Sequence, residues 1–135
     1  MAHDVVVVGG GVIGLASAWE MARQGLSVIV LDRGRPDAAA TWAAAGMLAP
    51  QSEASAHSPF FDLCLASLRL FPAFADSLRE DSQVDCEFAR TEALCLAASE
   101  EEAARLCALA QWQAAAGLSS EYLKPEDAVQ VEPAI

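Results

Sequence analysis

The chain has 135 residues, enough for a domain with a buried core, and 54% of them are hydrophobic, which excludes a disordered chain. Its formal net charge of −11 argues against nucleic acid or an anionic membrane surface as a partner. The first residues have no basic region and only a short apolar run that glycines interrupt. We therefore expect neither a signal peptide nor a membrane span.

The four cysteines form no Cys-x-x-Cys pair and have no zinc-ligand spacing. Two of them fall in stretches with a helical pattern and two in stretches with a strand pattern. We therefore expect reduced thiols in the core, no metal site and a cytoplasmic location. These residues are Cys64, Cys86, Cys95 and Cys107.

The first part of the chain has the order of a βαβ unit. An apolar strand, 4–8, runs into Gly-Gly-Gly-Val-Ile-Gly at 9–14, which reads G-x-G-x-x-G. A helical stretch follows over 12–23, and a second apolar strand, 27–31, ends on Asp32. The glycine motif in this context, with an acid roughly 20 residues on, predicts a dinucleotide-binding site.

Each part of this unit has a physical role. Gly9 permits the tight turn, Gly11 lets the backbone approach a pyrophosphate, and Gly14 lets the helix pack closely on the sheet. The helix N-terminus offers free N–H groups and a partial positive charge to the phosphates. Asp32 can accept hydrogen bonds from ribose hydroxyls.

A run of small residues covers 38–50, after a turn at 34–37 that Gly and Pro favour. By propensity, its alanines predict a helix. The alternative is that small side chains let the backbone pack against a flat, bulky ligand, and composition does not choose between the two. Glu53, just beyond, is expected to be a solvated loop acid, with a place near an active-site mouth as the alternative.

A long helix is predicted from Pro59 to about Arg79. Ser58 is a good N-cap, Pro59 suits the first helical position, and Asp62 suits the first turn. Pro72 should kink or divide this helix. Its aromatic residues recur at helical spacing, so we expect them in the core.

The last part of the chain has a mixed pattern. Two short strands are predicted at 85–90 and 93–98 and a third at 121–123. Ser99 and Glu102 fit a capping box for a helix that runs to residue 116 and ends at Gly117. A further short helix should begin at Pro125.

The segment 41–50, placed just after the βαβ acid, resembles the flavin-dependent amine oxidases of the D-amino-acid oxidase family. It is most similar to the glycine oxidases of bacterial thiamine biosynthesis. Members carry Ser or Thr, often followed by Trp, and then small residues that end in Gly-Met-Leu or Gly-Ile-Leu. The resemblance continues through 58–63, the long helix, 84–86 and 126–133.

The resemblance implies FAD as the cofactor. The pyrophosphate would lie at the glycine turn, the adenosine ribose at Asp32, and the adenine or ribose beside Arg33. Ala40 and Thr41 would face the phosphates and ribityl chain, and 45–47 would face the isoalloxazine ring. The implied cofactor residues are Gly9, Gly11, Val12, Ile13, Gly14, Asp32, Arg33, Ala40, Thr41, Ala45, Gly46 and Met47.

The expected fold class is α/β: a Rossmann-like FAD-binding βαβ unit with the beginning of an α+β substrate domain, truncated before completion. We expect an FAD-binding segment at 1–58, a helical segment at 59–84, and part of a substrate or cap domain at 85–135. The family's carboxylate-binding Arg and Tyr come later in the chain, so no catalytic residue is assigned.

The implied activity is oxidative deamination of glycine or a small amine to an imine, with O2 reduced to H2O2. Small-molecule substrates are the expected partners, and homo-oligomerisation stays open. The alternatives are another flavin- or NAD-dependent dehydrogenase, against which the Gly46-Met47 segment argues in the NAD case, and a non-catalytic fragment that binds flavin weakly or not at all.

Overall fold

The structure, a computed structural model, describes residues 2–34 and 40–135. The chain divides into two compact units, Met1–Met47 and Leu48–Ile135. All twelve predicted cofactor residues lie among the described residues of the first unit. Ala38 and Ala39 of the small-residue run lie outside the described residues. The domain limits expected after residues 58 and 84 remain predictions.

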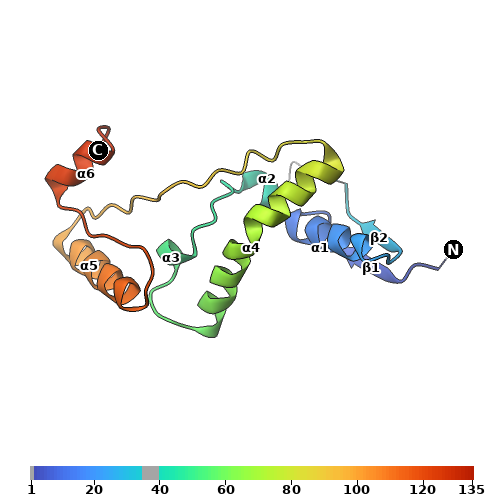
Figure 1. Cartoon of the computed structure of the whole chain (residues 1–135), viewed down its shortest axis with the longest axis horizontal. Helices are drawn as coiled ribbons and strands as arrows, with labels where there is room; N and C mark the ends of the chain where they lie inside the picture. Colours follow the sequence, from blue (N-terminus) through green and yellow to red (C-terminus); the bar gives the residue numbers. More distant parts are fainter. Residues whose placement is uncertain (1, 35–39) are drawn as a thin grey trace. The chain divides into compact units, whose positions relative to one another are not determined.

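The first unit is a βαβ motif, as its sequence pattern predicts (Figure 1). Strands β1 (Val5–Val8) and β2 (Val28–Leu31) pair in parallel, with Val5 opposite Val28 and Val8 opposite Leu31. Helix α1 (Val12–Arg23) connects them. The β-branched residues favour the strands, and the helix begins directly after the glycines.

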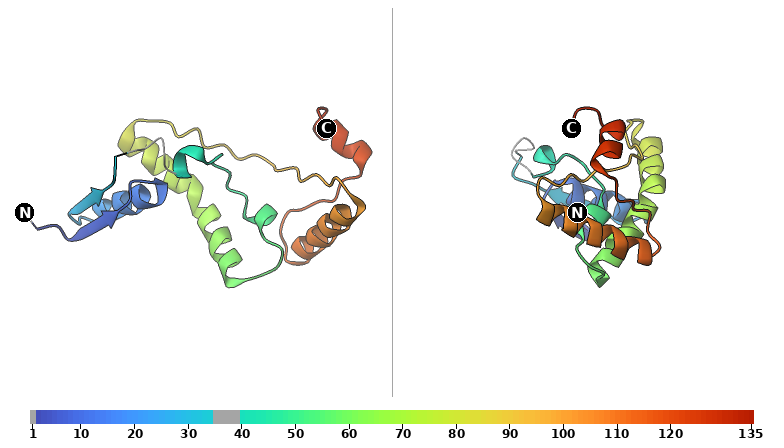
Figure 2. Two further views of the ribbon diagram at one scale, coloured as in Figure 1. Left: turned by 180° about the vertical axis from the view of Figure 1, so that it is seen from behind. Right: turned by 90° about the vertical axis from the view of Figure 1, so that its left-hand side faces the viewer.

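Helix α1 covers one face of the two strands (Figure 2). Val5 and Val7 are half-buried, whereas Val6 is 56% and Val8 84% exposed. Ala18, a small side chain in the middle of α1, is buried. Within the first unit, the second face of the sheet has no covering layer among the described residues.

The small-residue run is helical only in part. Helix α2 (Ala40–Ala43) is one turn long, and α3 (Pro50–Glu53) is another. Residues 44–49 between them have no regular secondary structure. Intrinsic helix propensity of alanine is a weak preference, and a segment this short cannot offset the cost of helix nucleation without packing.

Helix α4 (Pro59–Ser82) begins as predicted. The Ser58 Oγ atom accepts a hydrogen bond from the Phe61 N–H at 3.1 Å, and Pro59 occupies the first turn. The helix continues through Pro72, three residues beyond its predicted end, and stops where Gln83 adopts a left-handed φ of 58°. Figure 1 shows that α4 bends partway along its length, for which an internal proline is the ordinary cause.

Helix α5 (Glu100–Ala115) has the predicted cap at each end. The Glu102 N–H donates to the Ser99 Oγ atom at 3.2 Å, and the Glu102 carboxylate accepts from the Ala98 N–H at 2.8 Å. Gly117 follows the helix with φ of +74°. Helix α6 (Pro125–Val131) begins at its predicted proline.

The core of the second unit gathers around α4 and α5. Phe61 is 3% exposed, and its ring centroid lies 5.4 Å from that of Trp112. Gln113 beside Trp112 is 4% exposed, the most buried polar side chain among the described residues. The aromatic residues at positions 71 and 74 are half-buried and in ring contact, so the core assignment of the α4 aromatics holds in part.

The predicted strands at 85–90, 93–98 and 121–123 are wrong. These segments have no regular secondary structure, and the first two run as an extended coil between α4 and α5 (Figure 1). An alternating pattern specifies which face of a strand is apolar, but a strand also needs a partner whose backbone groups pair with its own. No such partner lies among the described residues of the second unit.

All four cysteines are free thiols, as expected. The expectation that they lie in the core is wrong for Cys86 and Cys95, which are exposed because the strands that would have buried them do not form. Cys64 and Cys107 on the helices are half-buried. Within the described ranges, no helix is both long and apolar enough to cross a membrane.

Candidate dinucleotide-binding site

The turn after β1 depends on its first and last glycines. Gly9 has φ of +111°, which non-glycine residues rarely adopt, and its N–H continues the strand pairing by donating to the Leu31 carbonyl at 2.8 Å. A Cβ atom on Gly14 would overlap the carbonyl oxygen of Gly9. Gly14 therefore allows α1 to start directly against the end of β1, as the motif predicts.

Asp32 joins the end of β2 to this turn. Its Oδ2 atom accepts the Gly10 N–H at 2.6 Å, and its Oδ1 atom accepts the Gly34 N–H at 2.9 Å. The hydrogen bond from Gly10, followed by that from Gly34, lowers the pKa of the Asp32 carboxyl group. The side chain is exposed, and a carboxylate with two bonded N–H groups retains lone pairs for further donors.

Thr41 reaches the same turn from α2. Its Oγ1 atom accepts the Val12 N–H at 3.0 Å. A Cβ atom on Gly11 would lie 3.1 Å from this oxygen, closer than ordinary contacts. The structure thus brings together the glycine turn, the acid after β2 and the first polar residue of the small-residue run, three parts that are separated in sequence.

Two backbone donors remain at the start of α1. Among the described residues, the N–H groups of Gly11 and Ile13 have no hydrogen-bond partner. The first N–H groups of a helix point along its axis, and the helix dipole adds a partial positive charge there. Val12 and Ile13 are 55% and 79% exposed, so the turn is open to a ligand. Chemically, this arrangement suits an anion such as a phosphate.

The remaining predicted residues are present but make fewer contacts. Arg33 follows Asp32 with an exposed side chain, and Ala40 begins α2. Ala45, Gly46 and Met47 follow α2 in an irregular segment, where Gly46 has φ of +74° and Met47 is 77% exposed. The structure gives these residues no hydrogen bond to the glycine turn among the described contacts.

Gly10 and Gly34 contribute in a way that the motif did not predict. Gly10 occupies a variable position of G-x-G-x-x-G, yet its N–H donates to Asp32, and a Cβ atom there would lie 3.2 Å from the Asp32 side chain. The available signal was the run of three consecutive glycines. Gly34 was predicted only as a turn residue, and its φ of +74° lets its N–H face the same carboxylate.

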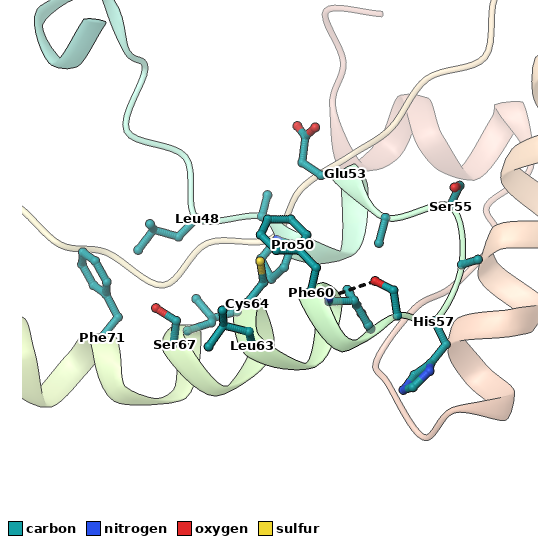
Figure 3. Close-up of a pocket in the computed structure, with 16 residues that line it drawn as sticks. Leu48, Pro50, Glu53, Ser55, His57, Phe60, Leu63, Cys64, Ser67 and Phe71 are labelled. Atoms are coloured by element: carbon teal, nitrogen blue, oxygen red, sulfur yellow. Dashed lines mark hydrogen bonds between the residues drawn. The ribbon is translucent and has the colours of Figure 1, made fainter. Parts of the chain in front are cut away.

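The second unit holds a separate, mainly apolar pocket of about 820 Å³ (Figure 3). Its walls come from 48–50, α3 and the first half of α4, with Leu48, Phe60, Leu63 and Phe71 among the apolar side chains. Glu53 also lines it, at the end of α3 and not in a loop as expected. The described residues contain no group of His, Cys, Asp and Glu arranged to hold a metal.

Comparison with known proteins gives consistent matches along the chain. A family model described as FAD dependent oxidoreductase matches residues 4–135. Over 131 residues the chain is 38% identical to glycine oxidase of Geobacillus kaustophilus, an alignment that covers 97% of the chain and 35% of that protein.

Two further relatives match over shorter lengths. The bifunctional protein ThiO/ThiG of Trichormus variabilis is 46% identical over 80 residues, 59% of the chain and 12% of that protein. One subunit of the opine oxidase of Rhizobium meliloti is 35% identical over 100 residues, 73% of the chain and 27% of that protein. The chain spans about a third of the length of the glycine oxidases that it matches.

Proposed function

The chain belongs to the FAD-dependent oxidoreductase family, and we propose that it is the N-terminal, FAD-binding part of a flavin-dependent oxidase of glycine or another small amino acid. The observation that carries the proposal is the glycine turn itself. Its Gly11 and Ile13 N–H groups lie between two polar side chains, Asp32 and Thr41, that already contact the same turn. A dinucleotide needs a phosphate site and a ribose site at this spacing.

The residues present fit FAD. The Gly11 and Ile13 N–H groups would hold the pyrophosphate, in a turn that Gly9 and Gly14 keep tight. Asp32 would accept a ribose hydroxyl, because its carboxylate is exposed and charged at neutral pH, and Arg33 would lie beside the adenosine. Ala40, Thr41, Ala45, Gly46 and Met47 are assigned to the ribityl chain and the isoalloxazine ring.

When bound, FAD would supply the two-electron chemistry that converts the amine to an imine and reduces O2 to H2O2. The chain's own residues bind and orient the cofactor. Glycine as the substrate is supported by the similarity to proteins named glycine oxidase, and a place in thiamine biosynthesis by the resemblance in the 41–50 segment. No residue of this chain is assigned to catalysis, and a cytoplasmic location is supported by its four free thiols.

A second candidate is a flavin-dependent dehydrogenase or oxidase of a larger amine. The 35% identity to a protein of opine oxidase supports it, since the family's FAD-binding residues do not choose the substrate. A third is a non-catalytic fragment, which the exposed Val6 and Val8 of the two-stranded sheet favour.

The visible spectrum of the purified chain tests the proposal, followed by titration of the colourless protein with FAD and with NADH. A flavin spectrum, or saturable FAD binding without NADH binding, is the expected result. Peroxide formation on adding glycine, but not on adding a larger opine, would extend the proposal to the substrate. Binding of NADH in preference to FAD would refute it.

A further inference from the structure

Helix α1 lacks a cap of its own. Its N-cap residue is Gly11, which has no side chain, and no acidic residue lies in the first turn. Most helices satisfy one of their first N–H groups with a Ser, Thr, Asp or Asn side chain at the N-cap. Here the equivalent oxygen comes from Thr41, 29 residues further along the chain, and accepts the Val12 N–H.

Gly11 makes this contact possible. With a Cβ atom at position 11, the distance to Thr41 Oγ1 would be 3.1 Å, so either the hydroxyl or the turn would have to shift. The absence of a side chain at Gly11 therefore serves two purposes. It lets a ligand approach the backbone, and it admits Thr41 to the helix N-terminus.

The contact has a consequence for the segment that follows. Thr41 lies in α2, which is a single turn and too short to be stable alone. The bond to Val12 ties α2, and through it the residues up to Met47, to the first turn of α1. A hydroxyl that accepts one N–H still has its own proton to donate, so Thr41 keeps a donor for an anion held by the Gly11 and Ile13 N–H groups.

We propose that Thr41 is a positioning residue that caps α1 from outside the helix and holds the 40–47 segment to the glycine turn before FAD binds. The capping part stands on the structure alone. The effect on FAD rests on the proposed function. In this arrangement the two parts of the cofactor site, the phosphate turn and the ring segment, are already joined when the cofactor arrives.

Substitution of Thr41 tests the capping part without any ligand. Thr41→Val keeps the shape and removes the hydroxyl, and Thr41→Ser keeps the hydroxyl. Hydrogen exchange at the Val12 amide, followed by NMR, should be at least about fivefold faster in Thr41→Val, as expected for a lost cap, and unchanged in Thr41→Ser. The Gly10 amide, which donates to Asp32, reports whether the turn is otherwise intact.

The chain offers a matched control. Thr91, its other threonine, is exposed in the extended segment between α4 and α5, so Thr91→Val should leave Val12 exchange as it is in the unchanged chain. Faster exchange at Val12 alone in Thr41→Val supports the proposal. Equal Val12 exchange in Thr41→Val and the unchanged chain overturns it.

FAD titration, followed by quenching of flavin fluorescence, tests the second part. Because the cap and the segment would have to form at the moment of binding, Thr41→Val should raise the dissociation constant about fivefold or more, with recovery in Thr41→Ser. Unchanged or tighter binding in Thr41→Val would mean that the phosphate displaces the hydroxyl, which overturns this part. Failure of the unchanged chain to bind FAD would refute the proposed function, while the amide exchange would still decide the role of Thr41.

Discussion

The Asp32 Oδ2 atom lies 2.6 Å from the Gly10 nitrogen, and these two residues are 22 positions apart in the sequence. The contact joins the end of β2 to the glycine turn after β1. Because the same carboxylate also accepts the Gly34 N–H, one side chain orders the turns at the ends of both strands. Asp32 is thus part of the structure of the turn as well as the expected ribose ligand.

The first prediction concerns pH. The two backbone donors lower the pKa of Asp32 below 3.8 in the folded chain, so its carboxylate is stabilised by folding. This contribution to the free energy of unfolding should be complete above the unfolded pKa of about 3.9 and should be lost as pH falls through the folded pKa. The Gly10 amide chemical shift, measured by NMR against pH, should follow this titration.

Asp32→Asn is the control for this titration. It has no carboxylate at this position, so the corresponding step in the Gly10 shift should disappear. A midpoint at or above 3.8 in the unchanged chain, or the same step in Asp32→Asn, would contradict the assignment.

The second prediction concerns Gly14. In Gly14→Ala the new methyl group would overlap the Gly9 carbonyl oxygen, so α1 must move away from the sheet. Overpacking of this kind costs roughly 1–3 kcal/mol, although alanine has the higher helix propensity. Thermal unfolding followed by circular dichroism should show the loss. Ser17→Ala, at an exposed position of the same helix, should show none. Equal stability of the two variants would exclude the steric role.

The third prediction concerns the buried amide of Gln113. Its Nε2 donates to the Gln51 carbonyl at 2.7 Å, and its Oε1 accepts from the Gln51 Nε2 at 3.2 Å, across 62 residues. Gln113→Leu would leave both Gln51 groups without this partner, at a cost of about 1–3 kcal/mol. Urea unfolding should detect it as a lower midpoint with an unchanged slope.

Gln111→Leu is the matched control for Gln113. Gln111 is two positions earlier on α5 and exposed, and its side chain makes only a 3.5 Å contact with the Cys107 sulfur. Its unfolding midpoint should stay near that of the unchanged chain. If both variants unfold together, burial of the Gln113 amide has no energetic role.

The fourth prediction concerns the start of α5. Ser99→Ala removes the oxygen that accepts the Glu102 N–H, and loss of an N-cap costs about 1 kcal/mol. Hydrogen exchange in the first turn of α5 should rise, whereas the last turn, near Gly117, should change little. Ser55→Ala, an exposed serine outside the helices, provides the comparison. Unaltered exchange at Glu102 would show that the cap contributes nothing.

Features that depend on near neighbours could be predicted from the sequence. The βαβ order follows from the valine strands and the glycines between strand and helix, and α4, α5 and α6 begin at the residues that predicted them. A cap joins groups only three or four positions apart, so residue type and spacing are sufficient to specify it. The family followed in the same way, because its two glycine-containing segments are contiguous in the sequence.

Contacts between distant residues were decided by the tertiary structure. Nothing in the residues themselves indicates that Thr41 caps α1, that Gly10 donates to Asp32, or that Gln51 pairs with Gln113. The segment 85–98 shows the same limit, since its alternating pattern describes a strand but cannot supply the partner that completes one. The sequence by itself thus determined the elements, their ends and the family. Tertiary structure decided which polar groups meet at the glycine turn, because a hydrogen bond depends on distance in space and not along the chain.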